Sequence, residues 1–129
     1  MRGIGYSIVA LSVVVAAAAA GGPADPCANP TLVGTSENDT LIGTEGADVI
    51  VGGAGNDLIL GLGGNDTLCG GPGNNLMDGG LGNDLVIGGA ENDVLIGNHG
   101  TDTATGGAGE DRCWAETTQG CELDVPIPL

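Results

Sequence analysis

Large aliphatic side chains recur at a spacing of nine residues through most of the chain. Counted from Gly34, the sequence divides without a gap into nine nonapeptides, here called repeats, that end at Trp114. The first place of every repeat is Gly, the fourth is Gly in seven repeats, and the sixth is Asp in eight. Places seven to nine hold mostly Val, Leu, Ile and Thr. A fixed period of this kind predicts a repeat architecture.

The two parts of each repeat predict different local structures. Gly, Asn and Asp in places one to six favour a tight turn, and the aliphatic residues of places seven to nine favour a short strand. The middle residue of such a strand points opposite to its neighbours, so place eight is expected to face inward. Stacked copies bury that row, which predicts an all-β fold, a parallel β-roll or β-solenoid of nine repeats with two repeats per coil. The inward residues would be Leu41, Ile50, Ile59, Leu68, Met77, Val86, Leu95, Ala104 and Cys113.

The charge balance excludes several classes of function. The chain has 17 acidic residues against Arg2 and Arg112, a formal net charge of −15, which disfavours nucleic acids and anionic membranes as partners. It has no Phe, one Trp and one Tyr, so base stacking is not expected. An enzyme is not expected either, because Ser36 and His99 would lie about 17 Å apart by strand spacing, too far for a nucleophile and its base. His99 is expected to be a solvated turn residue.

The sixth place of the repeat holds the candidate metal ligands. Two repeats per coil put each sixth residue next to the one 18 positions later, in two rows: Asp39, Asp57, Asn75, Asp93 and Asp111, and Asp48, Asp66, Asp84 and Asp102. Two carboxylates about 5 Å apart repel by roughly 3 kcal/mol at an effective dielectric of about 20, so several such pairs would exceed the stability of a small domain. Ca²⁺ would relieve this repulsion, because it accepts carboxylate and carbonyl oxygens. The pairings between coils allow several ions, up to about seven.

These repeats resemble the RTX calcium-binding nonapeptide family, the haemolysin-type calcium-binding repeat, with its pattern G-G-x-G-x-D-x-U-x. Residues 52–60 and 79–87 match that pattern fully, and the resemblance covers residues 34–114. It implies a parallel β-roll with Ca²⁺ held between the turns by Asp side chains and loop carbonyls. The ligands that it implies are Asp39, Asp48, Asp57, Asp66, Asp84, Asp93, Asp102 and Asp111, with a weak contribution from the neutral Asn75. The sequence departs from the pattern at Glu37 and Glu91, where a turn loses a glycine.

The segments that flank the repeats predict export and capping. Residues 1–20 have a basic start and an apolar run that ends in small residues, which predicts a secretory signal peptide cleaved after Ala20 or, alternatively, Ala24. An uncleaved membrane anchor is the other interpretation, although the run is short for one. Residues 21–33 are expected to form a linker and N-terminal cap, and residues 115–129 a C-terminal cap and tail. The mature protein is therefore expected to be secreted, with no membrane contact after cleavage.

Four cysteines in an exported chain suggest two disulfides, for which three pairings exist. Cys113 and Cys121 are close in sequence and suited to closing the last coil. Cys27 precedes the first repeat and Cys69 ends the fourth, about one coil away, whereas Cys69 and Cys113 would be about 12 Å apart. The favoured pairs are therefore Cys27–Cys69 and Cys113–Cys121, with free thiols as the alternative. Trp114 is expected to cover the open end of the core.

Two functions of different classes fit these observations. The first is calcium ion binding by an exported β-roll whose folding is coupled to Ca²⁺. The second is a secreted structural or adhesion solenoid that presents a repeated surface to a partner or matrix. The outward places that would carry such a surface are mixed (Thr40, Val49, Leu58) and form no regular threonine row. The sequence identifies calcium ions as the partner and names no protein or surface partner.

Overall fold

The computed structural model describes residues 6–9 and 24–124 of the chain, and every regular element within them is a β-strand. The strands are β1 (Tyr6–Val9), β2 (Leu32–Val33), β3 (Asn38–Ile42), β4 (Val49–Val51), β5 (Leu58–Leu60), β6 (Thr67–Pro72), β7 (Leu76–Leu81), β8 (Leu85–Ala90), β9 (Val94–His99), β10 (Thr103–Gly107), β11 (Arg112–Trp114), β12 (Thr117–Gln119) and β13 (Leu123–Asp124). This part of the chain contains no helix of the length and hydropathy needed to cross a membrane.

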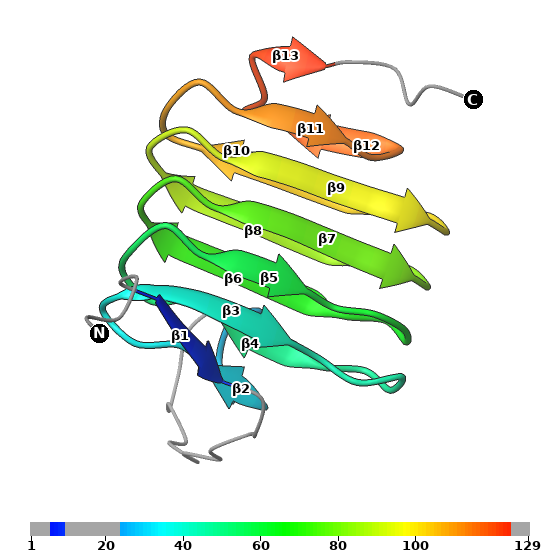
Figure 1. Ribbon diagram of the computed structural model, residues 1–129. Coiled ribbons are helices and arrows are strands. Elements are labelled where there is room, and N and C mark those ends of the chain that lie inside the picture. The colour runs from blue at the N-terminus through cyan, green and yellow to red at the C-terminus, as the bar shows by residue number, and fades with distance from the viewer. Residues whose placement is uncertain (1–5, 10–23, 125–129) are drawn as a thin grey trace.

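The strands form two parallel sheets, and the chain alternates between them (Figure 1). One sheet has the order β1-β3-β5-β7-β9-β11-β13, and the other has the order β12-β10-β8-β6-β4-β2. Paired residues along the repeats are 18 positions apart, as in Leu41 with Ile59 and Ile59 with Met77. Two repeats therefore make one coil. The predicted all-β, parallel β-roll is confirmed.

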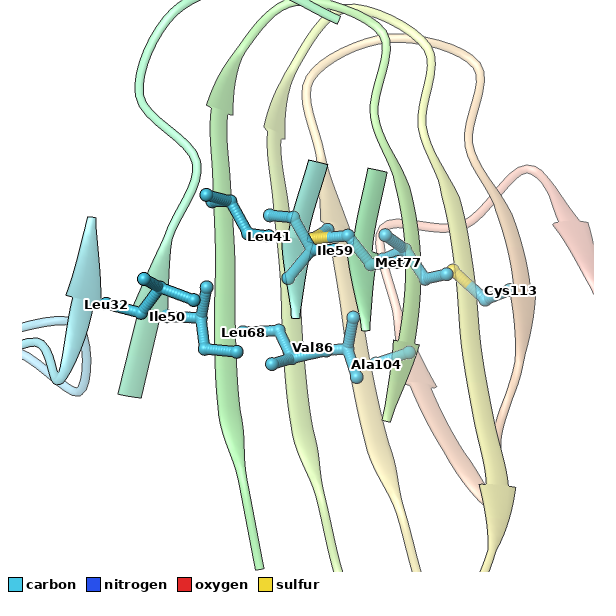
Figure 2. Close-up of a cluster of buried hydrophobic side chains, with 10 residues drawn as sticks. Leu32, Leu41, Ile50, Ile59, Leu68, Met77, Val86, Ala104 and Cys113 are labelled. Atoms are coloured by element: carbon cyan, nitrogen blue, oxygen red, sulfur yellow. The ribbon is translucent and has the colours of Figure 1, made fainter. Parts of the chain in front are cut away.

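The core is one row of side chains from each sheet. Every eighth-place residue is buried, with a relative exposure of 0–1 %, while its neighbours in places seven and nine of β4 and β5 are partly exposed. Figure 2 shows the two rows running side by side along the roll, with Leu32 at one end and Cys113 toward the other. The alternation follows from strand geometry, and place eight faces inward as predicted. Because each coil encloses only two inward side chains, aliphatic residues fill it without aromatics.

The strands are longer in the middle of the roll than the three-residue strands that the repeat predicts. β6 to β9 each have six residues and continue into the first places of the next repeat. Gly71 pairs with Gly89, and Pro72 with Ala90, across what the sequence predicts to be turn. A strand pairing of this kind extends the backbone hydrogen bonds between coils into the start of the turns.

The coil after the last repeat is shorter than the others and closes the roll. Thr103 pairs with Thr117 and Arg112 with Leu123, so the offset falls below 18. The structure joins Cys113 to Cys121, with 6.0 Å between their Cα atoms. Ala115 and Cys121 pack against the end of the core.

The expectation that Trp114 covers the end of the core is wrong. Trp114 follows the buried Cys113 in β11 and is only partly buried. The alternation of the strand therefore turns it outward, and a ninth-place residue cannot fill the space beyond the last eighth-place residue. His99 is exposed at the end of β9, as predicted.

The segment before the repeats is part of the roll. Leu32 is 4 % exposed and joins the core, and β2 pairs with β4. The structure joins Cys27 to Cys69, with 6.2 Å between their Cα atoms. Of the predicted signal peptide, residues 1–5 and 10–20 lie outside the described residues, and Tyr6–Val9 pairs with Asn38–Leu41 as strand β1. Residues 21–23 and 125–129 of the predicted caps also lie outside the described residues.

Candidate metal centres

The sixth-place side chains form two rows that run along the roll at the end of the turns. All nine are buried, with a relative exposure of 0–8 %. One row leads into the strands of the odd-numbered sheet and holds Asp39, Asp57, Asn75, Asp93 and Asp111, and the other holds Asp48, Asp66, Asp84 and Asp102. The two predicted rows are therefore present, here called the aspartate ladders. Carboxylates at this depth are costly unless something compensates their charge.

One oxygen of each ladder side chain from Asp57 to Asp111 joins its coil to the coil before it. The backbone N–H of Asp39 donates to Oδ1 of Asp57 at 2.8 Å, and that of Asp48 to Oδ1 of Asp66 at 2.8 Å. The same bond recurs at every step to Asp111, with Oδ1 of Asn75 as the acceptor from the N–H of Asp57 at 2.9 Å. Each side chain from Asp57 onward thus accepts from the coil before it, whereas Oδ1 of Asp39 and Asp48 accepts from the hydroxyls of Thr35 and Thr31.

The other oxygen is buried and has no hydrogen-bond partner in six of the turns. These atoms are Oδ2 of Asp57, Asp66, Asp84, Asp93, Asp102 and Asp111. An unpartnered buried carboxylate oxygen is strongly unfavourable, so such a group in a native structure calls for a proton or an ion. We call these six turns the acceptor-only turns.

Asn75 shows what this second position faces. Its Nδ2 donates to the carbonyls of Gly71 at 3.3 Å and Gly73 at 3.2 Å, which are places two and four of its own turn. Asn75 Nδ2 and Asp57 Oδ2 occupy equivalent positions, because each lies 2.6 Å from where a Cβ on the first-place glycine would stand. In an acceptor-only turn, the carboxylate oxygen therefore faces two carbonyl oxygens, and none of the three has a proton to share.

A set of oxygen acceptors of this kind fits Ca²⁺. Calcium takes six to eight oxygen ligands, including carboxylates and backbone carbonyls, in flexible geometry. Within the described residues, no three His, Cys, Asp or Glu side chains converge as a metal-binding group. That agrees with turns that each contribute one carboxylate and otherwise backbone carbonyls. Zinc, which prefers Cys and His ligands, does not fit.

The ladder environment also changes the acidity of its members. Burial, together with neighbouring carboxylates such as Asp84 and Asp111, raises the pKa of Asp66 and Asp93 to about 6, against the N–H bonds that lower it. Burial likewise raises the pKa of Asp57, Asp84 and Asp102, which each accept an N–H from the preceding coil that opposes the change. Without a cation, burial in the roll thus shifts these carboxyl groups toward the neutral acid.

The first two repeats hold their aspartates differently. Thr44 donates to Oδ2 of Asp48 from its backbone N–H at 2.7 Å and from its hydroxyl at 2.9 Å. Thr35 donates to Oδ2 of Asp39 from the same two groups. We call these the threonine turns. In them the second carboxylate oxygen has two donors before any metal is considered.

Sequence reasoning missed two carboxylates that end the ladders. Oε2 of Glu116 accepts the N–H of Asp102 at 2.8 Å, and Oε2 of Glu122 accepts the N–H of Asp111 at 2.9 Å. They replace the aspartate that a further coil would supply. The period could not reveal them, because they lie 14 residues after Asp102 and 11 after Asp111, whereas the repeats predict 18.

Sequence reasoning also missed a ladder of another kind, built from fifth-place asparagines. Oδ1 of Asn38 accepts the N–H of Asn56 at 2.7 Å, Asn56 accepts from Asn74 at 2.9 Å, and Asn74 accepts from Asn92 at 3.0 Å. Here each side chain accepts from the coil after it, opposite to the aspartate ladders. The recurrence of Asn before Asp was the available signal.

A parallel β-roll whose turns bury carboxylates against carbonyl oxygens defines the class of this protein. The chain matches the model of the RTX calcium-binding nonapeptide repeat in four overlapping copies, over residues 33–68, 42–77, 52–86 and 78–113. These cover more than half of the chain, which therefore belongs to that family. Membership implies Ca²⁺ binding by the β-roll, and the buried aspartates fit it. No curated protein and no solved structure matches the chain.

Proposed function

We propose that this protein is an exported calcium-binding module whose β-roll folds when it meets Ca²⁺. Calcium is bound at the turns by the sixth-place aspartates together with turn carbonyls. The two disulfides support an oxidising destination outside the cytosol, as does the predicted signal peptide. In a calcium-rich medium, binding would supply the free energy that the thin core lacks.

The observation that carries this proposal is the set of six buried, unpartnered Oδ2 atoms. Each one destabilises the metal-free roll, because a buried charge without a partner loses its hydration and gains nothing in return. Calcium removes that cost only in the folded state, where the carbonyls of the same turn face the carboxylate. Folding and metal binding are then one equilibrium.

The test is far-UV circular dichroism of the full chain, and of a form lacking residues 1–20, first in EDTA and then through a Ca²⁺ titration. We expect a coil-like spectrum in EDTA that becomes strand-like as Ca²⁺ is added, and no such change with Mg²⁺ at the same concentration, since Mg²⁺ demands a stricter octahedral geometry. A strand spectrum that does not respond to EDTA would contradict calcium-coupled folding.

Substitution of single ladder residues tests the ligand assignment. Asp57→Ala and Asp84→Ala should each remove about one Ca²⁺ or more per chain, because each deletes one carboxylate from an oxygen set. Isothermal titration calorimetry gives the number of ions bound. A count equal to that of the wild type in both variants would remove these residues from the site.

A structural or adhesion role is the second candidate. A shallow groove of about 480 Å³ runs across the outer face beside the asparagine ladder, between Asn38 and Val94. Its floor mixes asparagines with Thr40, Leu58 and Leu76, so it offers both polar and apolar contacts to a partner. This role would become the first candidate if the roll kept its strand spectrum in EDTA.

A further inference from the structure

We propose that three turns of the roll take no calcium, because a side chain already supplies the protons that the metal would replace. They are the two threonine turns, at Asp39 and Asp48, and the turn at Asn75. Calcium then occupies the six acceptor-only turns. This inference rests on the proposed calcium binding and specifies where along the roll it occurs.

The threonine turns differ from the others in backbone conformation. The second place has a positive φ in the seven later repeats, including Leu62 at 79° and Asn98 at 78°. Thr35 and Thr44 are not among the positive-φ residues. A β-branched residue strongly disfavours that region. Threonine therefore keeps the ordinary conformation and directs its N–H and hydroxyl to the carboxylate.

The later turns keep the positive φ even where a side chain makes it costly. Leu62 is not glycine, and a left-handed conformation costs such a residue about 1–2 kcal/mol. Its turn nevertheless leaves Oδ2 of Asp66 without a donor. The stacking of the turns therefore imposes the acceptor-only geometry, and turns with threonine in the second place do not adopt it.

At Asn75 the amide takes the position of the metal. Its Nδ2 donates to the carbonyls of Gly71 and Gly73, the two backbone oxygens that an acceptor-only turn would offer to an ion. A cation at that position would meet an NH₂ group instead of a carboxylate oxygen. The ladder that leads into the odd-numbered strands is thus interrupted at Asn75, with calcium at Asp57 before it and at Asp93 and Asp111 after it.

The experiment is native mass spectrometry of the full chain at saturating Ca²⁺, which counts ions per molecule. Asp66→Asn and Asp48→Asn form a matched pair on neighbouring coils of one ladder. We expect Asp66→Asn to lose about one ion and Asp48→Asn to lose none, because the amide oxygen of the substituted side chain would still accept from Thr44. Asn75→Asp is expected to gain about one ion, since it restores a carboxylate that faces two carbonyls.

The outcomes separate this inference from the proposed function. No Ca²⁺ on the wild-type protein would defeat the proposed function itself. Wild-type binding with equal losses in the Asp48 and Asp66 variants, or with no gain in Asn75→Asp, would overturn this inference alone. The gain expected from Asn75→Asp does not depend on whether the loss variants fold.

A different observation supports a second inference: Glu116 and Glu122, outside the repeats, complete the calcium sites of the last two turns. Asp102 and Asp111 have 0 % exposure and an unpartnered Oδ2, although no further repeat follows them. Their backbone N–H groups donate to Glu116 and Glu122 just as earlier ones donate to the next aspartate. The short last coil therefore supplies the carboxylates that a further coil would supply.

The backbone of the C-terminal cap also supplies the carbonyl that the next coil places beside an internal aspartate. A Cβ on Gly52 would meet the carbonyl of Gly70 and Oδ2 of Asp57. A Cβ on Gly106 would likewise meet the carbonyl of Gly120 and Oδ2 of Asp111. Gly120 thus stands where the first glycine of a further repeat would stand, and the oxygens around Asp111 resemble those of an internal turn.

Glu122→Gln tests this assignment, and Glu110→Gln is the control. Glutamine keeps the acceptor for the N–H of Asp111 but removes the charge, so a purely structural cap would be unaffected. We expect Glu122→Gln to lose about one ion or to weaken one site at least tenfold in calorimetry. Glu110 and Glu122 both have exposed side chains, but the N–H of Asp111 donates to Glu122 and not to Glu110, so the Glu110 variant should match the wild type. Equal counts and affinities in both variants would refute the role of Glu122.

Discussion

The first coil of the roll, residues 34–51, and the repeats that follow it share a period but differ in how they hold their aspartates. In the first coil, threonine N–H and hydroxyl groups satisfy Oδ2 of Asp39 and Asp48. In the later repeats, Oδ2 is buried without a donor in every turn that has an aspartate. The same strand pairing and the same core thus support two kinds of turn.

The difference shows that the sixth-place aspartate has two separate roles. In the later repeats its Oδ1 accepts the N–H of the ladder residue one coil earlier. In the first coil, Oδ1 of Asp39 and Asp48 accepts instead from the hydroxyls of Thr35 and Thr31. Its Oδ2 is satisfied within the turn by threonine in the first coil, and it is available to a cation elsewhere. The residue in the second place, rather than the aspartate, decides between the two.

The largest expected difference between the two regions is in the loss of stability when a fourth-place glycine is replaced by alanine. Gly64 has a φ of +92°, and a Cβ there would stand 2.6 Å from the backbone N of Ala47 in the preceding coil. A Cβ on Gly46, one coil earlier, would stand 3.7 Å from the Thr44 hydroxyl, which is an ordinary van der Waals contact. We expect Gly64→Ala to lower the free energy of unfolding by about 4 kcal/mol or more. Gly46→Ala should stay within about 0.5 kcal/mol of the wild type.

Urea denaturation in excess Ca²⁺ measures both variants. If the two lost similar free energy, the turns of the two regions would have the same backbone demands, and the contrast between them would fail.

The next largest effect concerns the disulfides at the two ends. Cys27–Cys69 spans 42 residues and ties the segment before the repeats to the end of the fourth repeat, whereas Cys113–Cys121 spans eight. The chain-entropy relation gives about 4 kcal/mol for the longer loop and about 2.5 kcal/mol for the shorter. The double variant Cys27→Ala/Cys69→Ala should therefore unfold at lower urea than Cys113→Ala/Cys121→Ala. The reverse order would show that the C-terminal cap, not the attachment of the N-terminal segment, limits stability.

The smallest effect is a pH dependence that belongs to the acceptor-only turns. The pKa of Asp66 and Asp93 is about 6 in the folded roll, above the ordinary value of about 3.9 in an unfolded chain. The folded state therefore binds more protons between these values, and the metal-free roll gains stability as the pH falls through about 6. In EDTA, the strand signal in circular dichroism should rise between pH 7 and pH 5. In excess Ca²⁺ it should not rise, because protons compete with the metal for the same oxygens.

A strand signal in EDTA that falls on acidification would mean that protonation does not relieve the buried carboxylates. The pH dependence would then give no support to the contrast between the first coil and the later repeats.

Periodicity predicted the coil, the inward row and the two aspartate ladders, because each depends only on spacing. It could not predict the roles of Thr35 and Thr44, which depend on the backbone conformation that threonine adopts in the second place. Glu116 and Glu122 were out of its reach because their offsets break the period. Trp114 was misplaced because its size suggested a cap, whereas strand alternation determines its direction.

Glu91 shows that a departure from the repeat pattern need not change the structure of the turn. It replaces the fourth-place glycine of its repeat, yet it keeps a φ of +70°. Its carboxylate accepts the N–H of Gly73 at 2.7 Å in the neighbouring coil. A departure from the consensus thus leaves the turn intact, because a hydrogen bond offsets the backbone strain.

The opposite directions of the asparagine and aspartate ladders bear on self-assembly. The fifth places of the last two repeats, Thr101 and Glu110, donate their N–H groups to Asn83 and Asn92 but bring no amide side chain of their own. The aspartate N–H groups at the same end are taken by Glu116 and Glu122. A second molecule that approached this end would find the aspartate ladders closed and no amide side chain to continue the asparagine ladder. The C-terminal end of the roll therefore disfavours the head-to-tail growth that turns stacked β-coils into fibres.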